Sequence, residues 1–382
     1  MRRRIHRRPE LGLDLPETQA LVVETLSSLG LQPRLGKGLS SVTAVIGADR
    51  PGRTMLLRAD MDALPMPESS SVEFASELDG RMHACGHDMH VAMLLGGARL
   101  LVDRVRADSS SLLGPILLMF QPGEEGFAGA RIMLDEGLLD GLDPGTTRGF
   151  AIHMSTRYPA GEVHGRPGAQ QASADNFVIT IRGRGGHASM PHLAADPIPV
   201  AAELILALQA AVTRTVDVFD PAVLTIGHVV AGTTHNVIPE IAVLEGTFRC
   251  VSETRRTAMP ELIRRVVDGV ASAHGLTAEV RFHEIYPVTM NDLAVFENVR
   301  AIAVDLLGEA DVHTAPSPTM PAEDWSFVLQ RIPGVMVDLG GRPRDRALQG
   351  YPQTHSSTVV FDEPAMAVGA SLHAKVALEL LP

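Results

Sequence analysis

The chain of 382 residues has only two cysteines, Cys85 and Cys250, and none of its apolar runs reaches the ~18 residues that a membrane span needs. Two cysteines cannot build a disulfide framework, so we expect a protein of a reducing compartment, the cytoplasm. Basic residues are also few, because 33 Lys and Arg stand against 45 Asp and Glu, a formal net charge of −12. This acidic balance argues against nucleic acid and membrane as partners.

We also find no targeting segment, internal repeat or low-complexity tract in the sequence. Arg2, Arg3, Arg4, Arg7 and Arg8 open the chain, but the following PELGLDLPETQ is neither an apolar signal core nor free of acids, as a transit peptide would be. We therefore expect these arginines to form one face of an N-terminal helix that runs into LVVETLSSLG.

Apolar residues make up 45% and charged residues 20%, which indicates a globular chain of two or three domains. Three short apolar runs end in polar residues, namely TMLLRADMDAL, GPILLMFQPGEEG and GFAIHMS, the last predicted to end at His153. The apolar helix VAMLLGGARLL separates the first two. Alternating strands and helices predict an α/β domain with a largely parallel sheet, and ligands bind such sheets beyond the carboxyl ends of the strands.

The middle of the chain follows another order, β-α-β-β-α-β, which predicts a ferredoxin-like α+β module. Beyond about Pro287 the alternation of helices and strands resumes. The predicted fold class is therefore α/β, with a split catalytic domain over 1–168 and 286–382 whose mixed, largely parallel sheet is flanked by helices. The ferredoxin-like domain is inserted at 169–285.

The densest group of chemically active residues is MHACGHDMH, which contains His83, Cys85, His87, Asp88 and His90. Thiolate and imidazole two residues apart suit zinc and neighbouring transition metals better than magnesium or calcium. The alternative for a lone Cys-x-His pair is a buried cysteine beside histidines on a solvated turn.

Adjacent carboxylates, Glu124 and Glu125, follow the second apolar run. Metal-assisted hydrolysis explains such a pair, because one carboxylate can ligate a cation while its neighbour takes a proton from water. The alternative is a helix N-terminus that favours acids. Asp60 and Asp62 follow the first apolar run, and their spacing of two residues places both side chains on the same side of the strand. We expect them to orient metal-bound groups. The alternative is that they are solvated loop carboxylates.

Single histidines at two further places are candidate ligands. His153 ends an apolar strand, and taken alone it would be interpreted as a core histidine. His355 precedes the last helix, and taken alone it would be interpreted as a neighbour of the helix N-cap. In the insert, GRGGHASMPH contributes His187 and His192 to a glycine-rich turn, and Asn236 and Arg249 follow. These residues form a candidate oxyanion donor and carboxylate clamp, with turn chemistry and a surface arginine as the alternative.

Eight blocks of the chain resemble the amidohydrolase branch of the aminoacylase and carboxypeptidase metallopeptidases, which includes hippurate hydrolases, N-acyl-amino-acid amidohydrolases and indole-acetyl-amino-acid hydrolases. In chain order the blocks are LLRADMDALP, MHACGHDMH, FQPGEEG, AIHMS, GRGGHASMPH, NVIPE, MPAEDWS and THSS. The resemblance runs in the family's order from about residue 5 to 380, which is almost the whole chain. The chain departs from the wider family, because Asp60-Met-Asp62 and Cys85-Gly-His87 stand where that family has a His-x-Asp pair and a bridging aspartate.

The resemblance implies two divalent cations per subunit, zinc or manganese first and cobalt or nickel as alternatives. Their ligands would be Cys85, His87, Glu125, His153 and His355. Glu124 would be the general base on a metal-bound water, and Asp62 would orient a metal-bound group. His187, from a partner subunit's insert, would stabilise the oxyanion. Asn236 and Arg249, with His192 nearby, would bind the substrate, and the insert would be the lid and dimerisation domain of a homodimer or higher homo-oligomer.

The expected activity is a metallo-amidohydrolase that splits N-acyl-amino acids, hippurate-like substrates, into a carboxylic acid and a free amino acid. The alternatives are a dipeptidase or an N-acetyl-diamino-acid deacetylase with the same metal centre, and a non-catalytic protein that binds acyl-amino acids. A binding protein has no need of a proton shuttle, so the presence of Glu124 argues against it.

Overall fold

The computed structural model describes residues 1–380. The chain forms two compact units. The first contains residues 1–170, 289–317 and those from 324 onward, and the second contains residues 171–288 and 318–323. The short segment 318–323 thus groups with the insert, a detail that the boundaries expected from the sequence do not include.

The first unit is built on an eight-stranded sheet. Its strands, in spatial order, are β1 (Arg34–Leu35), β2 (Val42–Ile46), β4 (Ile116–Gln121), β3 (Thr54–Asp60), β5 (Thr147–Pro159), β16 (Gly334–Arg342), β6 (Val163–Gly165) and β15 (Val312–Thr314). Strand β3 runs parallel to β4 and β5, β5 to β16, and β6 to β15. The other pairs are antiparallel. The sheet is mixed and largely parallel, as predicted.

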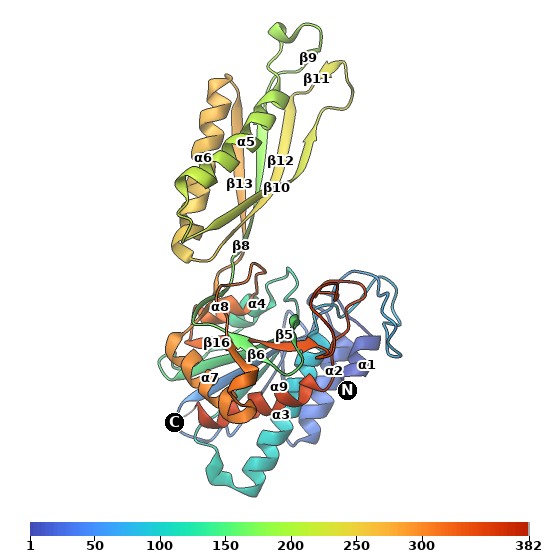
Figure 1. Ribbon diagram of the computed structural model, residues 1–382, viewed down its shortest axis with the longest axis vertical. Helices are drawn as coiled ribbons and strands as arrows, with labels where there is room; N and C mark the ends of the chain where they lie inside the picture. Colours follow the sequence, from blue (N-terminus) through green and yellow to red (C-terminus); the bar gives the residue numbers. More distant parts are fainter. Residues whose placement is uncertain (381–382) are drawn as a thin grey trace. The chain divides into compact units, whose positions relative to one another are not determined.

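Helices cover both faces of this sheet (Figure 1). One face carries α1 (Arg2–Arg7), α2 (Pro16–Ser28), α3 (His87–Ala107), α7 (Leu293–Leu307) and α9 (Ala365–Glu379). The other carries α4 (Gly129–Asp135) and α8 (Trp325–Leu329). Both faces of β3 and β4 are buried, which explains why these strands read as continuous apolar runs.

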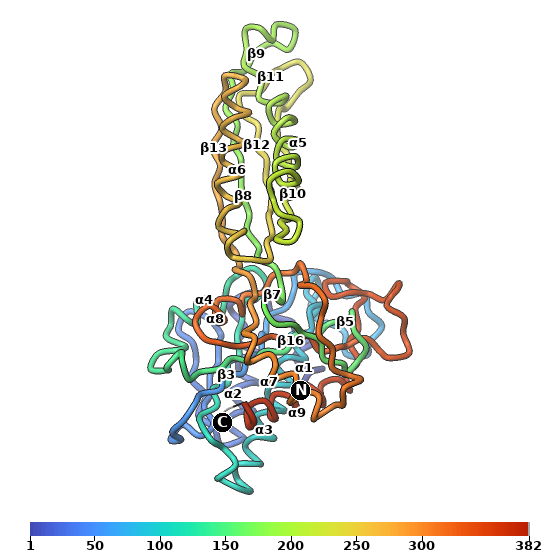
Figure 2. The backbone as a smooth tube through the Cα atoms, turned by 60° about the vertical axis from the view of Figure 1, so that its left-hand side comes forward, coloured from blue at the N-terminus to red at the C-terminus, as the bar shows by residue number. Residues whose placement is uncertain are grey.

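The second unit has a four-stranded antiparallel sheet in the order β10-β12-β8-β13. In chain order its elements are β8 (Ala174–Arg182), α5 (Pro197–Thr215), β10 (Ala222–Ala231), β12 (Ile241–Cys250), α6 (Glu253–Ala273) and β13 (Thr277–Tyr286). Helices α5 and α6 pack against each other and against this sheet (Figure 2). This is the predicted ferredoxin-like arrangement.

The remaining elements are short. They are β7 (Gly168–Gln171), β9 (Gly186–His187), β11 (Val237–Ile238), β14 (Thr289–Asn291) and the 3₁₀ turns η1 (Ser109–Ser111), η2 (Pro191–Leu193) and η3 (Glu309–Asp311). Polar side chains cap both helices of the second unit: Asp196 accepts from the Ile198 amide before α5, and Ser252 accepts from the Arg255 amide before α6.

Two sequence-based predictions of local structure are wrong. The N-terminal helix is not continuous, because α1 ends at Arg7 and Pro9 follows it, with Gly12 at φ +70° before α2 begins at Pro16. Strand β5 does not end at His153. Its pairing with β3 stops at Ala151, but β16 accompanies it to Pro159.

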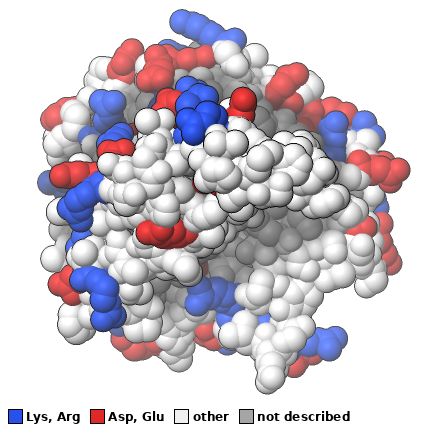
Figure 3. Space-filling model, turned by 90° about the horizontal axis from the view of Figure 1, so that it is seen from above, with Lys and Arg blue, Asp and Glu red and all other residues white. Residues whose placement is uncertain are grey.

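Helix α5 is the one element within residues 1–380 that is long and apolar enough to cross a membrane by length and composition. Its Val200, Leu204 and Leu208 are buried in the core of the second unit, as in the core helix of a globular domain. On the face drawn in Figure 3, basic and acidic side chains are interspersed, so the described residues form no broad basic patch on that side.

Candidate metal centre

Four of the predicted site residues lie at the carboxyl ends of three neighbouring strands. Asp62 follows β3, Glu124 and Glu125 follow β4, and His153 lies in β5 just beyond its last pairing with β3. His87 is the first residue of α3, which packs on these strands. The parallel order of β4, β3 and β5 therefore gathers side chains that are far apart in the sequence.

Gly86 makes the turn that brings Cys85 and His87 together. Its φ is +94°, a backbone conformation that favours glycine, and an added Cβ would lie 3.0 Å from the Met154 Cβ. Cys85 is buried, and its Sγ lies 3.4 Å from Nε2 of His153. The loop thus places a thiol and two imidazoles in one small volume.

Backbone carbonyls fix the proton on both of these imidazoles. His87 Nδ1 donates to the carbonyl of Asp62 at 2.7 Å, and His153 Nδ1 donates to the carbonyl of Met154 at 2.8 Å. A proton held on Nδ1 makes Nε2 the nitrogen of each ring that can ligate a metal. The Nε2 atom of His87 is buried and has no hydrogen-bond partner among residues 1–380.

Glu125 and His355 complete the cluster. His355 Nε2 lies 3.3 Å from Glu125 Oε1, which is itself buried without a hydrogen bond of good geometry among the described residues. His355 has φ +66°, an unusual conformation for a histidine, and its amide donates to the Ala84 carbonyl at 3.0 Å. This bond ties His355 to the segment that carries Cys85.

The donor atoms form overlapping groups in which each atom lies within 4.8 Å of the others. These groups include Cys85 with His87 and His153; Cys85 with Glu125 and His355; His87 with Glu124 and Glu125; and Asp60 with His87 and His90. Soft sulfur, imidazole nitrogen and carboxylate oxygen are the donor types of zinc and neighbouring transition metals. Together with His87 Nε2, which has no hydrogen-bond partner among residues 1–380, this donor set fits divalent cations.

Neighbouring imidazoles favour the ionised form of the Cys85 thiol. Burial raises the pKa of the Cys85 thiol, but His153 and His87 outweigh burial and bring that pKa down to about 6. Hydrogen bonds to Cys85 and Glu125 raise the pKa of His355 to about 10, although burial opposes them. Cys85 is therefore a thiolate at neutral pH, the form in which cysteine ligates metals.

Asp62 organises the turn that carries both glutamates. Its Oδ1 accepts the amide of Glu124 at 2.9 Å and its Oδ2 accepts the amide of Glu125 at 3.0 Å. Its backbone carbonyl also orients His87. Glu124 itself is buried. Asp62 thus positions two candidate ligands and the candidate base at once.

A buried ionic network lies beside the centre, and the sequence singled out only Asp60 and His90 among its members, neither of them as part of a network. Arg58 donates to Asp60 at 2.6 Å, to Gln121 at 2.9 Å and to Asp324 at 3.0 Å, and it is 1% exposed. Asp60 in turn accepts from His90 Nδ1. The available signal was an arginine in the middle of the apolar run TMLLRAD, where an unpaired charge would be costly.

His90 belongs to this network and is not placed to ligate. The Met154 amide donates to His90 Nε2 at 2.8 Å, so both ring nitrogens are occupied. Burial lowers the pKa of His90 to about 4 despite the neighbouring Asp60. The spacing in MHACGHDMH could not separate His90 from His87, because both lie on the first turn of α3.

A second buried network anchors α1 beside α3 and was missed by the sequence reading. Asp88 accepts from His6 Nδ1 at 2.8 Å and lies 2.6 Å from Arg2, while His6 Nε2 lies 3.2 Å from Glu68. Burial lowers the pKa of His6, but Asp88 and Glu68 outweigh it and raise that pKa to about 9. At least one of the N-terminal arginines, Arg2, is therefore a buried structural residue.

In the second unit, His187 and Asn236 line one pocket of about 580 Å³. Strands β9 and β11 bring them together, because Val237 pairs with His187. The Ser189 amide donates to His187 Nδ1 at 3.2 Å, so the ring carries its proton on Nε2, from which it can donate. His192 lies in η2 of the same loop and is exposed.

Arg249 lies elsewhere in the second unit. It is near the end of β12, eight residues from Ile241, which places it about 27 Å along the strand from the end nearest β11. Its guanidinium donates to the Met320 carbonyl at 3.2 Å, and burial lowers its pKa. Within one chain, the structure thus brings His187 and Asn236 together but separates Arg249 from both.

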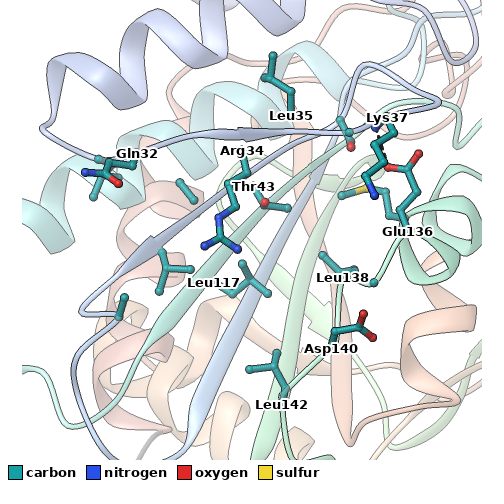
Figure 4. Close-up of a pocket in the computed structure, with 18 of the residues that line it drawn as sticks. Gln32, Arg34, Leu35, Lys37, Thr43, Leu117, Glu136, Leu138, Asp140 and Leu142 are labelled. Carbon is teal, nitrogen blue, oxygen red and sulfur yellow. Dashed lines mark hydrogen bonds between the residues drawn. The ribbon is translucent and has the colours of Figure 1, made fainter.

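A cavity of about 730 Å³ in the first unit is unrelated to this chemistry (Figure 4). Its lining includes Arg34, Lys37, Glu136 and Asp140 around an apolar floor, but neither histidine nor cysteine. Leu117, near the start of β4, lines it, whereas the glutamates follow the other end of that strand.

Residues 56–379 match the model of Peptidase family M20/M25/M40. The chain belongs to this family. Full-length relatives include Thermostable carboxypeptidase 2 of Saccharolobus solfataricus, 40% identical over 99% of this chain and 94% of the relative. N-acetylcysteine deacetylase of Bacillus subtilis is 37% identical (100% and 96% covered), and hippurate hydrolase of Campylobacter jejuni is 34% identical (100% and 96% covered).

A solved structure of an M20 relative has the same fold. The chain is similar to a dinuclear metal-binding peptidase of the M20 family from Bacillus subtilis, with a TM-score of 0.85, 33% identity, and 100% and 96% of the two chains covered. The family resemblance and the α/β fold expected from the sequence are therefore confirmed, and the M20 chain is a metallo-amidohydrolase.

Proposed function

We propose that this M20 enzyme hydrolyses the amide bond of N-acyl-amino acids with two divalent cations. The observation that carries the proposal is the convergence of Cys85, His87, His153, Glu125 and His355. Cys85, His87 and Glu125 each belong to at least two of these groups of donor atoms, so the groups share residues and lie side by side. The Bacillus subtilis relative named as a dinuclear metal-binding peptidase supports two cations.

Bound cations would polarise the scissile carbonyl and lower the pKa of water at the site. Glu124, buried beside the ligands, takes the proton of the attacking water and returns it to the leaving amine, a role typically worth ~10²–10⁴-fold in rate. Asp62 holds the Glu124 amide, so the base keeps its position through the reaction. Zinc or manganese is the proposed native metal.

The second unit supplies substrate-binding groups in this proposal. His187, with its proton on Nε2, donates to the oxyanion, and Asn236 lies in the same pocket. Arg249 binds the substrate carboxylate. Because Arg249 and Asn236 are far apart along one chain, a common substrate needs one of them from the insert of a partner subunit. We therefore propose a homodimer formed through the insert, in the cytoplasm, where Cys85 stays reduced.

The substrate class is supported by the relatives. Two of them are named for N-acetylcysteine and hippurate, both N-acylated amino acids. A peptide with a free carboxylate is the second candidate, because the relative with 40% identity is named a carboxypeptidase. Parallel assays on hippurate, N-acetyl-amino acids and unblocked dipeptides distinguish the two candidates, and faster cleavage of the dipeptides would overturn the first.

The sharpest test compares the adjacent glutamates. Glu124→Gln is expected to lower kcat by at least about 10²-fold while leaving the metal content unchanged, because it removes only the proton acceptor. Glu125→Gln is expected to lower the metal content, because it weakens a ligand. Metal analysis and initial rates on the same preparations check both. Full activity of Glu124→Gln would contradict the mechanism.

A further inference from the structure

A second group of metal-ligating side chains lies at the other edge of the large sheet. Glu162 precedes β6, His164 lies within β6, and His313 lies within the edge strand β15. The two strands are parallel, and His313 pairs directly with His164. Paired residues of neighbouring strands point to the same side of a sheet, so both imidazoles emerge together.

The distances between the donor atoms suit a single cation. Glu162 Oε2 lies 2.9 Å from His164 Nε2 and 3.6 Å from His313 Nε2, and the three donor atoms all lie within 4.8 Å of one another. In a tetrahedral zinc site with bonds of about 2.0–2.1 Å, neighbouring ligand atoms are about 3.4 Å apart. The separation of 2.9 Å between Glu162 and His164 is below this ligand–ligand distance, and the separation of 3.6 Å between Glu162 and His313 is above it.

Ring stacking holds the histidines in this arrangement. The Tyr158 ring stacks on His164 with centroids 3.6 Å apart, and His164 stacks on His313 with centroids 4.5 Å apart. Preorganised ligand rings lose little freedom when a metal binds. His164 is 13% exposed and His313 is 41% exposed, so the group is supported by packing on one side and open to solvent on the other.

The surrounding charges leave the group free for a cation. The Arg344 guanidinium is engaged with Asp311 at 2.7 Å and with the Ala160 carbonyl at 2.8 Å. Glu162 has His164 as its side-chain hydrogen-bond partner.

This group is distinct from the catalytic centre. In the sheet, Asp338 of β16 pairs with His153 on one side and with His164 on the other. Two strand spacings therefore separate His153 from His164, a distance of about 10 Å. None of its three donor residues belongs to the groups that contain Cys85.

We propose that Glu162, His164 and His313 bind one divalent transition-metal cation, such as Zn²⁺, with solvent completing its coordination. Two imidazoles and one carboxylate are a ligand set typical of zinc and of its neighbours in the transition series. The site lies within the first unit and needs no other chain.

Chemical modification tests the site residue by residue in the intact protein. Diethylpyrocarbonate reacts with unprotonated, unligated imidazole, and peptide mass spectrometry reports the rate at each histidine. Zn²⁺ is expected to slow modification of His313 at least about tenfold, because the metal occupies its ring nitrogen. His228, a 61% exposed histidine whose Nδ1 lies 3.1 Å from Glu245, is the control within the same digests.

Two outcomes would overturn the proposal: an unchanged rate at His313 in the presence of Zn²⁺, or equal slowing at His228. A second measurement uses variants at buffered free Zn²⁺ in equilibrium dialysis. Wild type and His228→Ala are expected to bind one more equivalent per chain than His313→Ala, while hydrolytic activity is the same in all three. Equal metal content in the three proteins would contradict the site.

Discussion

The two units of the chain hold their chemically active residues in opposite ways. In the first unit, Cys85 and His87 are buried, the protons on the imidazoles are fixed by backbone carbonyls, and five candidate ligands converge from distant segments. In the second unit, His187 is exposed, and Arg249 lies about 27 Å along β12 from the end nearest Asn236. The candidate ligands of the first unit meet within one chain. The candidate substrate-binding residues of the second unit do not all meet within one chain.

The two units therefore differ in how much change their chemically active residues tolerate. The metal centre depends on buried contacts that tolerate little change, such as the Gly86 turn against Met154. The residues of the insert sit on exposed turns, which can vary without disturbing a core.

The largest effect on the catalytic rate is expected from a substitution of His187. His187→Ala should lower kcat about 10²–10³-fold, equivalent to ~2.7–4 kcal/mol, as for other oxyanion donors. If this histidine acts in a partner's site, mixing His187→Ala with Cys85→Ala should restore about a quarter of the wild-type activity, because half of the dimers then contain one complete site.

Native mass spectrometry would show whether the subunits of the two variants exchange. With exchange established, the absence of any recovered activity would mean that each chain uses its own His187, and the contrast between a complete first unit and an incomplete second unit would not hold.

The next effect concerns the buried support of the metal centre. Arg58→Met should lower the free energy of unfolding by about 3–5 kcal/mol, because Asp60 and Asp324 remain buried without their cation. Arg99→Met is the matched control, since Arg99 lies 2.7 Å from Asp103 but both are more than half exposed. An exposed pair of this kind contributes under about 1 kcal/mol. Denaturant titrations of both variants give the comparison, and equal losses would contradict it.

The smallest predicted effect is a pH dependence in the first unit. The pKa of His6 is about 9 in the folded chain and about 6.5 when unfolded, so its stabilisation is complete below about pH 6.5 and is lost as the pH rises through 9. The difference in unfolding free energy between wild type and His6→Gln should fall by about 3 kcal/mol between pH 6 and about pH 10. A difference that stays constant over this range would show that His6 is neutral in the fold.

Much of the fold could be predicted from the sequence because its signals are local. The apolar runs of β3 and β4 and the order of elements in the insert predict the sheet and the ferredoxin-like module. The convergence of Glu125 and His153 was predicted from their positions at strand ends and from the family resemblance, whereas His355 was predicted from the resemblance alone. The structure places these residues together.

The remainder depends on contacts between distant segments, which spacing does not encode. Nothing local distinguishes His87 from His90; the Met154 amide does so by occupying His90 Nε2. Arg2 and His6 look like surface residues until Asp88 of α3 is placed beside them. The break between α1 and α2 was readable from Pro9 and Pro16, but the helical pattern on both sides obscured it.

Anomalous diffraction from crystals grown with Mn²⁺ or Zn²⁺ tests the central claim most directly. If the five side chains hold two cations, we expect two neighbouring anomalous peaks. Together these peaks should lie within coordination distance of Cys85 Sγ, His87 Nε2, His153 Nε2, Glu125 and His355. A structure in which these five side chains surround no metal under such conditions would contradict it.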